Sequence, residues 1–343
     1  MLPARNLCPL ITSAEQFTLT QGAAPCTMRA EALDKLGSMI HVLTRGGLGN
    51  QMFQYAYALQ LQRANAGKNI YLNGISHPFA SDNRELSLHH FQLTEKTRIC
   101  STLSGSILLV PFITTLLRNL GIRGLKSFLK GWKSYIIEHR QSLFADGLYL
   151  LNDVYMTPEI VQTDKNQHLF GFFQSISVID GIEDEIRKAF TVKTKPSEAN
   201  QKILDEIQSC NAVCLHIRRG DYSLYSNLQV CGESYFTEAV RQAKEELENP
   251  VFFVFSTGHE DIEWVREHYH FDAELRYVDQ DNVDYEELRL MMNCRHFIIS
   301  NSTFSWWAAV LSHAAGDAKK VWAPSTWMLE SDAQMVLPAW KTI

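Results

Sequence analysis

The chain has 343 residues, enough for two domains of ordinary size. Hydrophobic residues make up 45% of it and charged residues 20%, a balance typical of a globular protein and unlike that of a disordered one. The formal net charge is −6, so nucleic acid is not an expected partner, and any basic binding site has to be local.

Residues 1–37 form an N-terminal extension before the first predicted strand. They contain no sustained apolar core of the kind found in signal peptides, and Glu15 interrupts them early. We therefore expect a cytoplasmic protein without a secretory leader. The seven cysteines fit that location. They are odd in number, irregularly spaced and without a CxxC pair, which favours reduced, mostly buried thiols over disulfides or zinc ligands.

A strand, a glycine-rich turn and a helix open the folded part of the chain. Residues 39–44 are an apolar strand, RGGLGN at 45–50 is the turn, and residues 51–66 have helical apolar spacing up to Gly67. A second strand follows at 70–72, and this order is typical of a Rossmann-like domain. The turn lacks the Gly-Lys-Ser/Thr of a Walker A motif and does not complete GxGxxG. By itself it therefore indicates only a close approach of the backbone to another group.

The region between residues 80 and 190 is less regular. We predict the start of a helix at 157–163, a strand at 169–174 and a helix at 179–190. No acidic residue occurs between Glu95 and Glu138, while basic and apolar residues alternate at roughly helical spacing. This stretch, centred on 113–135, fits either a core-facing helix with a solvated basic face or peripheral contact with an anionic membrane. Residues 101–117 are too polar for a transmembrane helix.

Strands and helices alternate cleanly after a polar linker at 191–198. This alternation predicts a parallel, doubly wound sheet, in which ligands bind beyond the carboxyl ends of the strands. The predicted helices lie at 199–209, 233–248, 261–268, 285–294 and 304–315, and the strands at 212–217, 251–256, 275–278, 296–300 and 320–323.

Two adjacent arginines stand at the end of the predicted strand 212–217, in the sequence HIRRGDY at 216–222. Arginine binds phosphate bidentately and stays charged at all relevant pH values. Arg218 and Arg219 therefore predict a diphosphate site, although RRGD alone fits a salt-bridged turn equally well. Asp221 is placed either to orient a guanidinium group or to act as a base.

Small polar residues crowd the start of the predicted helix 304–315, in the sequence SNSTFSWW at 300–307. Hydroxyl and backbone N–H groups at a helix N-terminus form an anion site. One of these residues must cap the helix in any case. Four in a row exceed what a cap needs, so the pattern favours a second anion-binding element at the carboxyl ends of the strands.

Four motifs, in this order and at this spacing, resemble glycosyltransferase family 11, the α-1,2-fucosyltransferases: MIHVLTRGGLGNQMFQYAYA, HIRRGDY, FSTGHEDIEWV and HFIISNSTFSWWAA. They run from Met39 to about Ala309. The resemblance implies an α/β, GT-B fold, in which two Rossmann-like domains face each other across a cleft. Residues 38–195 would form the acceptor-side domain and residues 196–343 the GDP-fucose-binding domain. The implied reaction is inverting transfer of L-fucose from GDP-β-L-fucose, usually to O2 of a terminal galactose in a glycan acceptor, with no metal or other cofactor.

The resemblance also assigns site residues. Family members often carry Glu-Asp where this chain has Glu286-Glu287, so Glu287 is the candidate for guanine recognition, with a longer side chain. Arg218, Asp221 and Asn50 are placed near the reacting centre. The implied donor-binding residues are Gly47, Gly49, Gln51, His216, Arg218, Arg219, Glu287, Ser302, Thr303, Phe304 and Ser305.

Several alternatives stay open from the sequence. The DxD at 279–281 is typical of metal–nucleotide-sugar sites in another glycosyltransferase fold, but its spacing is common by chance and no metal site is expected. Other functions are fucosyl or other GDP-sugar transfer with a different linkage or acceptor, or non-catalytic binding of a GDP-sugar or glycan. The missing membrane anchor favours a bacterial-type enzyme. Residues 75–175 are expected to select the acceptor, and Trp306 and Trp307 to pack in the core.

Overall fold

The structure is a computed structural model. It describes residues 38–74, 85–100, 134, 137–151, 154–220, 222, 226–280, 282–312, 319–329 and 333–343. Four predicted features lie outside these ranges: the extension 1–37, the basic stretch 113–135 apart from Ser134, Asp221, and Asp281 of the DxD. Among the described residues, no helix combines the length and the apolar character that crossing a membrane requires.

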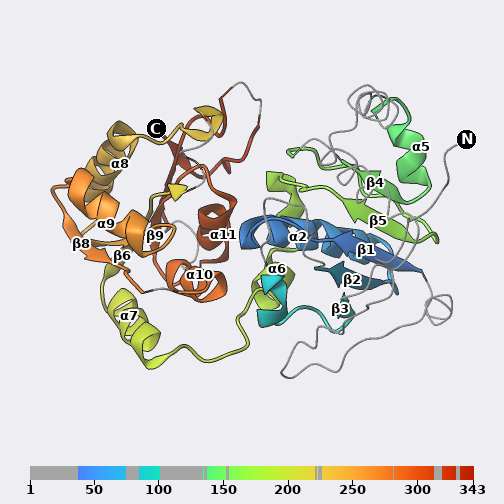
Figure 1. The fold of residues 1–343 in the computed structure, drawn as a ribbon, viewed down its shortest axis with the longest axis horizontal. Coiled ribbons are helices and arrows are strands. Elements are labelled where there is room, and N and C mark those ends of the chain that lie inside the picture. Colours follow the sequence, from blue (N-terminus) through green and yellow to red (C-terminus); the bar gives the residue numbers. More distant parts are fainter. Residues whose placement is uncertain are drawn as a thin grey trace, which may run out of the picture.

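A five-stranded parallel sheet forms the first half of the described chain (Figure 1). The strand order is β3-β2-β1-β5-β4. Helix α2 (Leu48–Ala64) packs on one face of this sheet through apolar side chains. The other elements of this half are β1 (Met39–Leu43), β2 (Asn69–Asn73), β3 (Thr97–Cys100), β4 (Leu148–Leu150), β5 (Gln167–Phe170), α5 (Arg140–Ala145), α6 (Glu183–Ala189), and the 3-10 turns η1 (Ser87–His90) and η2 (Ile176–Ile179).

A six-stranded parallel sheet forms the second half, in the order β11-β10-β9-β6-β7-β8. Helices α8 and α9 cover one face, while α7, α10 and α11 share the apolar core on the other face. The elements are α7 (Glu198–Ser209), β6 (Asn211–His216), η4 (Ser226–Leu228), α8 (Glu233–Glu246), β7 (Pro250–Phe255), α9 (His259–His268), β8 (Glu274–Tyr277), α10 (Asp284–Met292), β9 (His296–Ile298), α11 (Thr303–Leu311), β10 (Val321–Ala323) and β11 (Lys341–Thr342).

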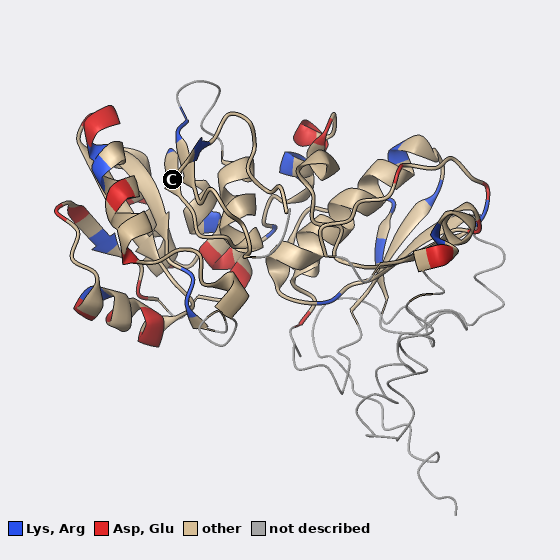
Figure 2. Ribbon diagram, turned by 90° about the horizontal axis from the view of Figure 1, so that it is seen from above, with Lys and Arg blue, Asp and Glu red and all other residues tan. Residues whose placement is uncertain are grey.

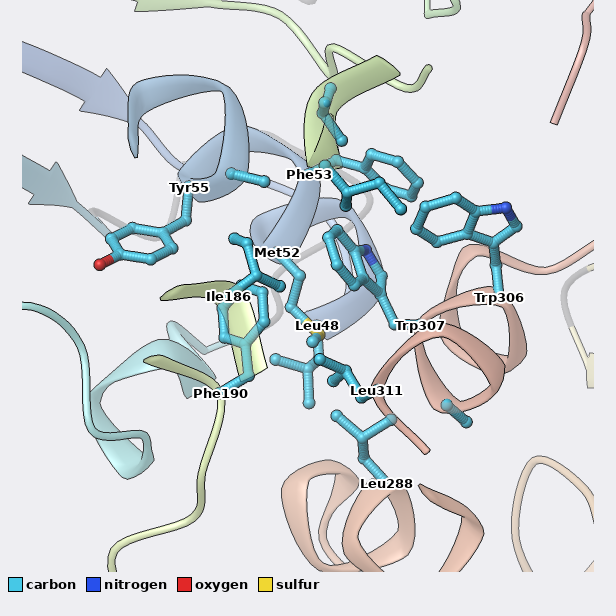
Figure 3. Close-up of a cluster of buried hydrophobic side chains, with 14 of the residues drawn as sticks. Leu48, Met52, Phe53, Tyr55, Ile186, Phe190, Leu288, Trp306, Trp307 and Leu311 are labelled. Atoms are coloured by element: carbon cyan, nitrogen blue, oxygen red, sulfur yellow. The ribbon is translucent and has the colours of Figure 1, made fainter. Parts of the chain in front are cut away.

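One apolar core joins the two halves, because α2 packs directly against α11. The Phe53 ring lies 4.8 Å from the Trp306 ring and 4.9 Å from the Trp307 ring between centroids, and all three side chains are fully buried. Figure 3 shows that Phe190 and Leu288, which come from other parts of the chain, pack in the same cluster. The prediction that both tryptophans pack in the core is confirmed, and their burial fixes the two sheets relative to each other.

The predicted fold class is confirmed. Two parallel, Rossmann-like sheets face each other, which is the GT-B arrangement. Every helix and strand predicted after residue 198 is present in the described chain, with ends that differ by a few residues. The exact domain limits, 38–195 and 196–343, stay a prediction.

One predicted helix start, at 157–163, is wrong, because this segment is an irregular loop. Its backbone groups bond to side chains of α2 and its C-cap instead of to one another. Tyr57 Oη donates to the Pro158 carbonyl (3.3 Å), and the Asn65 side chain accepts from Thr163 N (2.7 Å). The short elements β3, β4, β11 and α5 were not predicted either.

The described cysteines are all free thiols, so the predicted absence of disulfides holds for this part of the chain. The described cysteines are less buried than we predicted. Cys214 and Cys294 are buried, whereas Cys100, Cys210 and Cys231 are partly exposed.

Candidate functional site

A cavity of about 580 Å³ lies between the two sheets, beyond the carboxyl ends of their strands. In the first sheet it is lined by the segments that follow β1, β4 and β5, and in the second by those that follow β6, β7, β8, β9 and β10. The strand order reverses direction between β1 and β5 and again between β6 and β9. The cavity therefore lies where open α/β sheets bind ligands, as the sequence predicted.

Arg218 lines this cavity directly after β6. Its backbone N–H donates to Ser300 Oγ (2.9 Å), and that hydroxyl donates to the carbonyl group of His216 (2.7 Å). The guanidinium group donates to Thr257 Oγ1 (3.3 Å) and lies 5.2 Å from the centroid of the Tyr222 ring. Contacts from neighbouring strand ends thus hold the cation at the cavity.

Arg219 points to a different part of the molecule. Its Nε lies 3.5 Å from Asp261 Oδ1, and its guanidinium carbon lies 3.2 Å from the centroid of the Trp264 ring, both on α9. Gly220 follows with a positive φ of +48°. Arg219 is not among the residues that line the cavity, so we do not propose that it contacts the donor directly. The adjacent arginines therefore lie in different surroundings.

Two titratable groups, the buried His216 and the partly buried Glu287, share the cavity with Arg218. Burial, with the Arg218 charge adding to it, lowers the pKa of His216 to about 3, so its imidazole is neutral. Its Nδ1 has no hydrogen-bond partner in the described part of the chain. Burial raises the pKa of Glu287 to about 8, although Arg218 opposes the shift. The site therefore offers uncharged hydrogen-bonding groups beside a fixed cation.

The start of α11 faces the cavity through Ser302, Thr303 and Phe304. Ser302 is the helix cap, since its side chain accepts from Phe304 N (3.3 Å). Thr303 Oγ1 donates to Asn50 Oδ1 (3.3 Å) in the other half. Ser305 is fully buried and donates to two carbonyl groups of the same turn, so it does not reach the cavity.

The glycine turn of the first half is pressed against α11. A Cβ on Gly49 would lie 2.6 Å from Thr303 Oγ1 and 2.8 Å from Phe304 N. The Trp307 indole N–H also donates to the Gly49 carbonyl (3.0 Å). The close approach predicted from the glycines therefore includes an α helix of the other half. Gly47, the N-cap of α2, lines the cavity as well.

Asn50 and Gln51 are neighbours with different surroundings. Asn50 lines the cavity, and its Oδ1 accepts from Gln174 Nε2 (2.8 Å). Gln51 is buried below the turn, where its Nε2 donates to two backbone carbonyl groups (3.0 and 2.8 Å). Its Oε1 accepts from Ser87 N (2.9 Å). Gln51 is not a lining residue, so it supports the turn rather than facing a ligand.

Several cavity residues were not identified from the sequence. Phe172 and Gln174 closely follow β5, so the strand-end rule would have found them had the end of that strand been placed correctly. Tyr155 lies in an irregular loop, and Asp284 stands between the DxD at 279–281 and Glu287 without belonging to either. No local pattern distinguishes either of these two from an ordinary surface residue.

Asp279, the first aspartate of the DxD, lies near a small polar cluster outside the cavity lining. The side chains of His259, Glu263 and Asp279 place one potential ligand atom each within 4.8 Å of the others. Arg266 Nη2 lies 3.7 Å from Asp279 Oδ2. The positive charge of this guanidinium group disfavours a bound cation at the cluster, so we assign no metal site here.

Several known glycosyltransferases are similar to this chain. Residues 39–343 match the family described as Glycosyl transferase family 11. Alpha-1,2-colitosyltransferase of Escherichia coli is 29% identical over 306 residues, 84% of this chain and 92% of that protein. Galactoside alpha-(1,2)-fucosyltransferase 1 of Saimiri boliviensis boliviensis is 30% identical over 165 residues, 43% of each chain. Among solved structures, fucosyltransferase NodZ from Bradyrhizobium aligns with a TM-score of 0.47 at 12% identity, over 80% of this chain and 93% of that one. The chain belongs to glycosyltransferase family 11 and is a glycosyltransferase.

Proposed function

We propose that this protein transfers L-fucose from GDP-β-L-fucose to O2 of a terminal galactose in a glycan acceptor, with inversion and without a metal. The observation that carries the proposal is Arg218 in a cavity between two Rossmann-like sheets, beside His216 and Glu287. A permanent cation suits a diphosphate, and the two neighbouring titratable groups suit the edge of a base. Membership of family 11 and the fucosyltransferase among its relatives support this assignment.

The chemistry needs stabilisation of the leaving group. Breaking the bond between fucose and phosphate leaves negative charge on the β-phosphate of GDP. In our proposal Arg218 and the N–H groups at the start of α11 stabilise that charge, and one such donor is worth roughly 3 kcal/mol in the transition state. The acceptor hydroxyl attacks from the opposite face of the sugar, which inverts the anomeric centre.

The acceptor hydroxyl also loses a proton, and we propose Asp221 for this step on its position in the sequence. Asn50, which faces the cavity, has an amide that can orient the acceptor or the donor sugar but cannot serve as a base at neutral pH. Glu287 already holds its proton at neutral pH, so it is not the proposed base. We propose instead that it recognises guanine.

The rest of the donor site follows from the lining of the second half. We propose that His216 contacts the nucleotide and that Ser302, Thr303 and Phe304 hold the phosphates and the ribose. The backbone of Gly47 would face the donor from the first half. These residues share one cavity, so a single GDP-sugar can reach all of them.

A second donor is favoured by one observation, the match to an α-1,2-colitosyltransferase over 92% of that protein. Colitose is L-fucose without the 3-hydroxyl group, so both sugars fit the same pocket. A site that hydrogen-bonds a substrate hydroxyl rejects the analogue that lacks it by about 10⁴-fold, whereas an apolar site discriminates weakly. The ratio of activities with the two donors therefore reports what surrounds the sugar O3.

The deciding experiment supplies the purified protein with GDP-fucose or GDP-colitose and a panel of galactosides. We expect a fucosyl product with an α-1,2 linkage by NMR, formed equally well in EDTA. Transfer from GDP-colitose alone would replace the proposed donor, and another linkage would overturn the O2 assignment. Loss of activity in EDTA would contradict metal independence and point to Asp279. Binding of GDP without transfer to any acceptor would favour a non-catalytic binding protein.

We also propose, on the sequence alone, a cytoplasmic location with peripheral contact between the basic stretch 113–135 and an anionic membrane surface. The support is compositional: basic and apolar residues alternate there without an acidic residue.

A further inference from the structure

A hydrogen-bonded path links the glycine-turn helix of the first half to the acidic helix of the second. Gln51 Oε1, on α2, accepts from Ser87 N in η1 (2.9 Å). Ser87 Oγ then donates to Asp284 Oδ2, on the first residue of α10 (2.8 Å). Gln51 and Ser87 are both buried. Two residues separated by 197 positions thus meet beside the cavity.

The 3-10 turn η1 holds the start of α10 at two points. Besides the bond from Ser87, the His90 ring stacks on Tyr285 with centroids 3.8 Å apart and planes inclined by 19°. Asp284 Oδ1 accepts from Tyr285 N (2.8 Å), so each oxygen of the carboxylate has a fixed donor. The Asp284 side chain is therefore held by one hydrogen bond from its own helix and one from the opposite half of the molecule.

Asp284 lines the cavity next to the proposed guanine-recognition residue. The acidic first turn of α10, red in Figure 2, carries Asp284, Glu286 and Glu287. Glu286 is turned away from the cavity and pairs with Arg289 (3.0 Å). Asp284 and Glu287 are three positions apart, so they share one face of the helix. A carboxylate oxygen with one donor keeps a lone pair for a second.

We propose that Asp284 is a further donor-binding residue, accepting a hydrogen bond from the nucleoside of the GDP-sugar, and that Ser87 is the positioning residue that aims it. This inference rests on the proposed function. It also assigns a task to Gln51, which holds the Ser87 backbone and so acts on the donor site through two intermediate residues.

The test is a double-mutant cycle on GDP affinity, measured by titration calorimetry. Asp284→Asn should weaken GDP binding roughly 10- to 100-fold, because an acceptor with full negative charge is lost. Ser87→Ala should weaken it roughly three- to tenfold. In the Asp284→Asn background, Ser87→Ala should cause little further loss of GDP affinity, because there is no carboxylate left to position. Ser87→Thr keeps a hydroxyl group and should recover most of the affinity.

The kinetic signature separates aiming from a general structural effect. Ser87→Ala should raise the KM for the GDP-sugar while kcat at saturating donor stays near the unmodified value. The matched control is Ser312→Ala, which removes a buried hydroxyl bonded to the Cys294 carbonyl at the end of α11, away from the cavity. That variant should keep its GDP affinity even if its melting temperature falls.

The possible outcomes are distinct. Additive effects of Ser87→Ala and Asp284→Asn, or a Ser87→Ala variant with unchanged GDP affinity, would overturn the inference and leave the proposed function standing. Failure of the unmodified protein to bind GDP would instead overturn the proposed donor. Thermal melts confirm that each variant is folded. If Ser87→Ala does not fold, Ser87→Cys, which is close in size and a weaker donor, takes its place in the cycle.

Discussion

The two walls of the cavity come from similar strand–turn–helix units, yet they differ in charge. All the charged side chains among the described lining residues belong to the second half, and the first half contributes backbone, amide and aromatic groups. A diphosphate needs a fixed cation, whereas a neutral sugar needs shape, amides and ring faces. The charged wall carries Arg218 and Asp284 together with Glu287, which is protonated at neutral pH, and the uncharged wall carries Gly47, Asn50, Tyr155, Phe172 and Gln174.

The contrast between the walls is tested most strongly at Arg218. Arg218→Ala should lower kcat/KM by roughly 10²- to 10³-fold and weaken GDP binding, because the leaving group loses its cation. Arg218→Lys should have kcat/KM and GDP affinity between those of the unmodified protein and Arg218→Ala. An ammonium group keeps the charge but cannot bind two phosphate oxygens in the same plane. Transfer kinetics and GDP titration measure both variants.

Arg219 is the matched control for Arg218. Its guanidinium group lies against Trp264 and Asp261 rather than at the cavity. Arg219→Ala should therefore keep activity within about tenfold and lower the melting temperature, through loss of a cation–π contact worth about 1 kcal/mol. Equal loss of activity in the Arg218 and Arg219 variants would contradict the proposal that only Arg218 contacts the donor.

The contact between the walls is tested at Gly49. The methyl group of Gly49→Ala would meet the Thr303 hydroxyl and the Phe304 backbone, which forces α2 and α11 apart. We expect a loss of about 2–3 kcal/mol in the free energy of unfolding, measured in urea, together with lower kcat. Gly232→Ala, at a helix cap with nothing within 4 Å, should cost less than about 1 kcal/mol. A Gly49→Ala variant of normal stability would contradict the contact.

The charged wall should respond to pH through Glu287, whose pKa of about 8 leaves it protonated at pH 7. Binding the N–H donors of guanine as a carboxylate requires loss of that proton. GDP affinity should therefore rise by up to about tenfold per pH unit below pH 8 and level off above it. Titrations between pH 6 and 9 measure this slope, and Glu287→Gln should remove it. An unchanged slope in that variant would assign the proton to another group.

The same group makes stability depend on pH with the opposite trend. The pKa of Glu287 in the folded chain lies above its usual value of 4.5, so the folded state holds more protons between about pH 4.5 and 8. The free energy of unfolding should fall as the pH rises through this window. Glu287→Gln should flatten that part of the urea-unfolding profile.

The uncharged wall should give the smallest effect. Phe172→Leu removes an aromatic face from the cavity and should raise the acceptor KM by about threefold to tenfold, leaving the GDP affinity unchanged. Phe170→Leu is the control, because Phe170 stacks on the same Arg45 guanidinium group but does not line the cavity. A change in GDP affinity for Phe172→Leu would show that the donor reaches this wall.

Elements with strong local patterns could be predicted from the sequence. The strands and helices after residue 198 alternate as apolar runs and amphipathic segments, so their type and order follow from periodicity. The strands β3, β4 and β11 are two to four residues long, too short for a period to emerge. The prediction for residues 157–163 was wrong for another reason. Their backbone hydrogen-bond partners lie on α2 and its C-cap, about 100 positions away in the sequence.

The sequence by itself determined the family, the alternation of strands and helices, and the strand ends at which the site is built. It also placed Arg218, His216 and Asn50 at the cavity. Only the tertiary structure decided which of two neighbours lines the cavity, Arg218 or Arg219, Asn50 or Gln51. The direction of a side chain depends on what packs against it, and those partners are distant in sequence. The Ser87–Asp284 bond has the same origin, since it exists only because α2 and α11 bring the two sheets together.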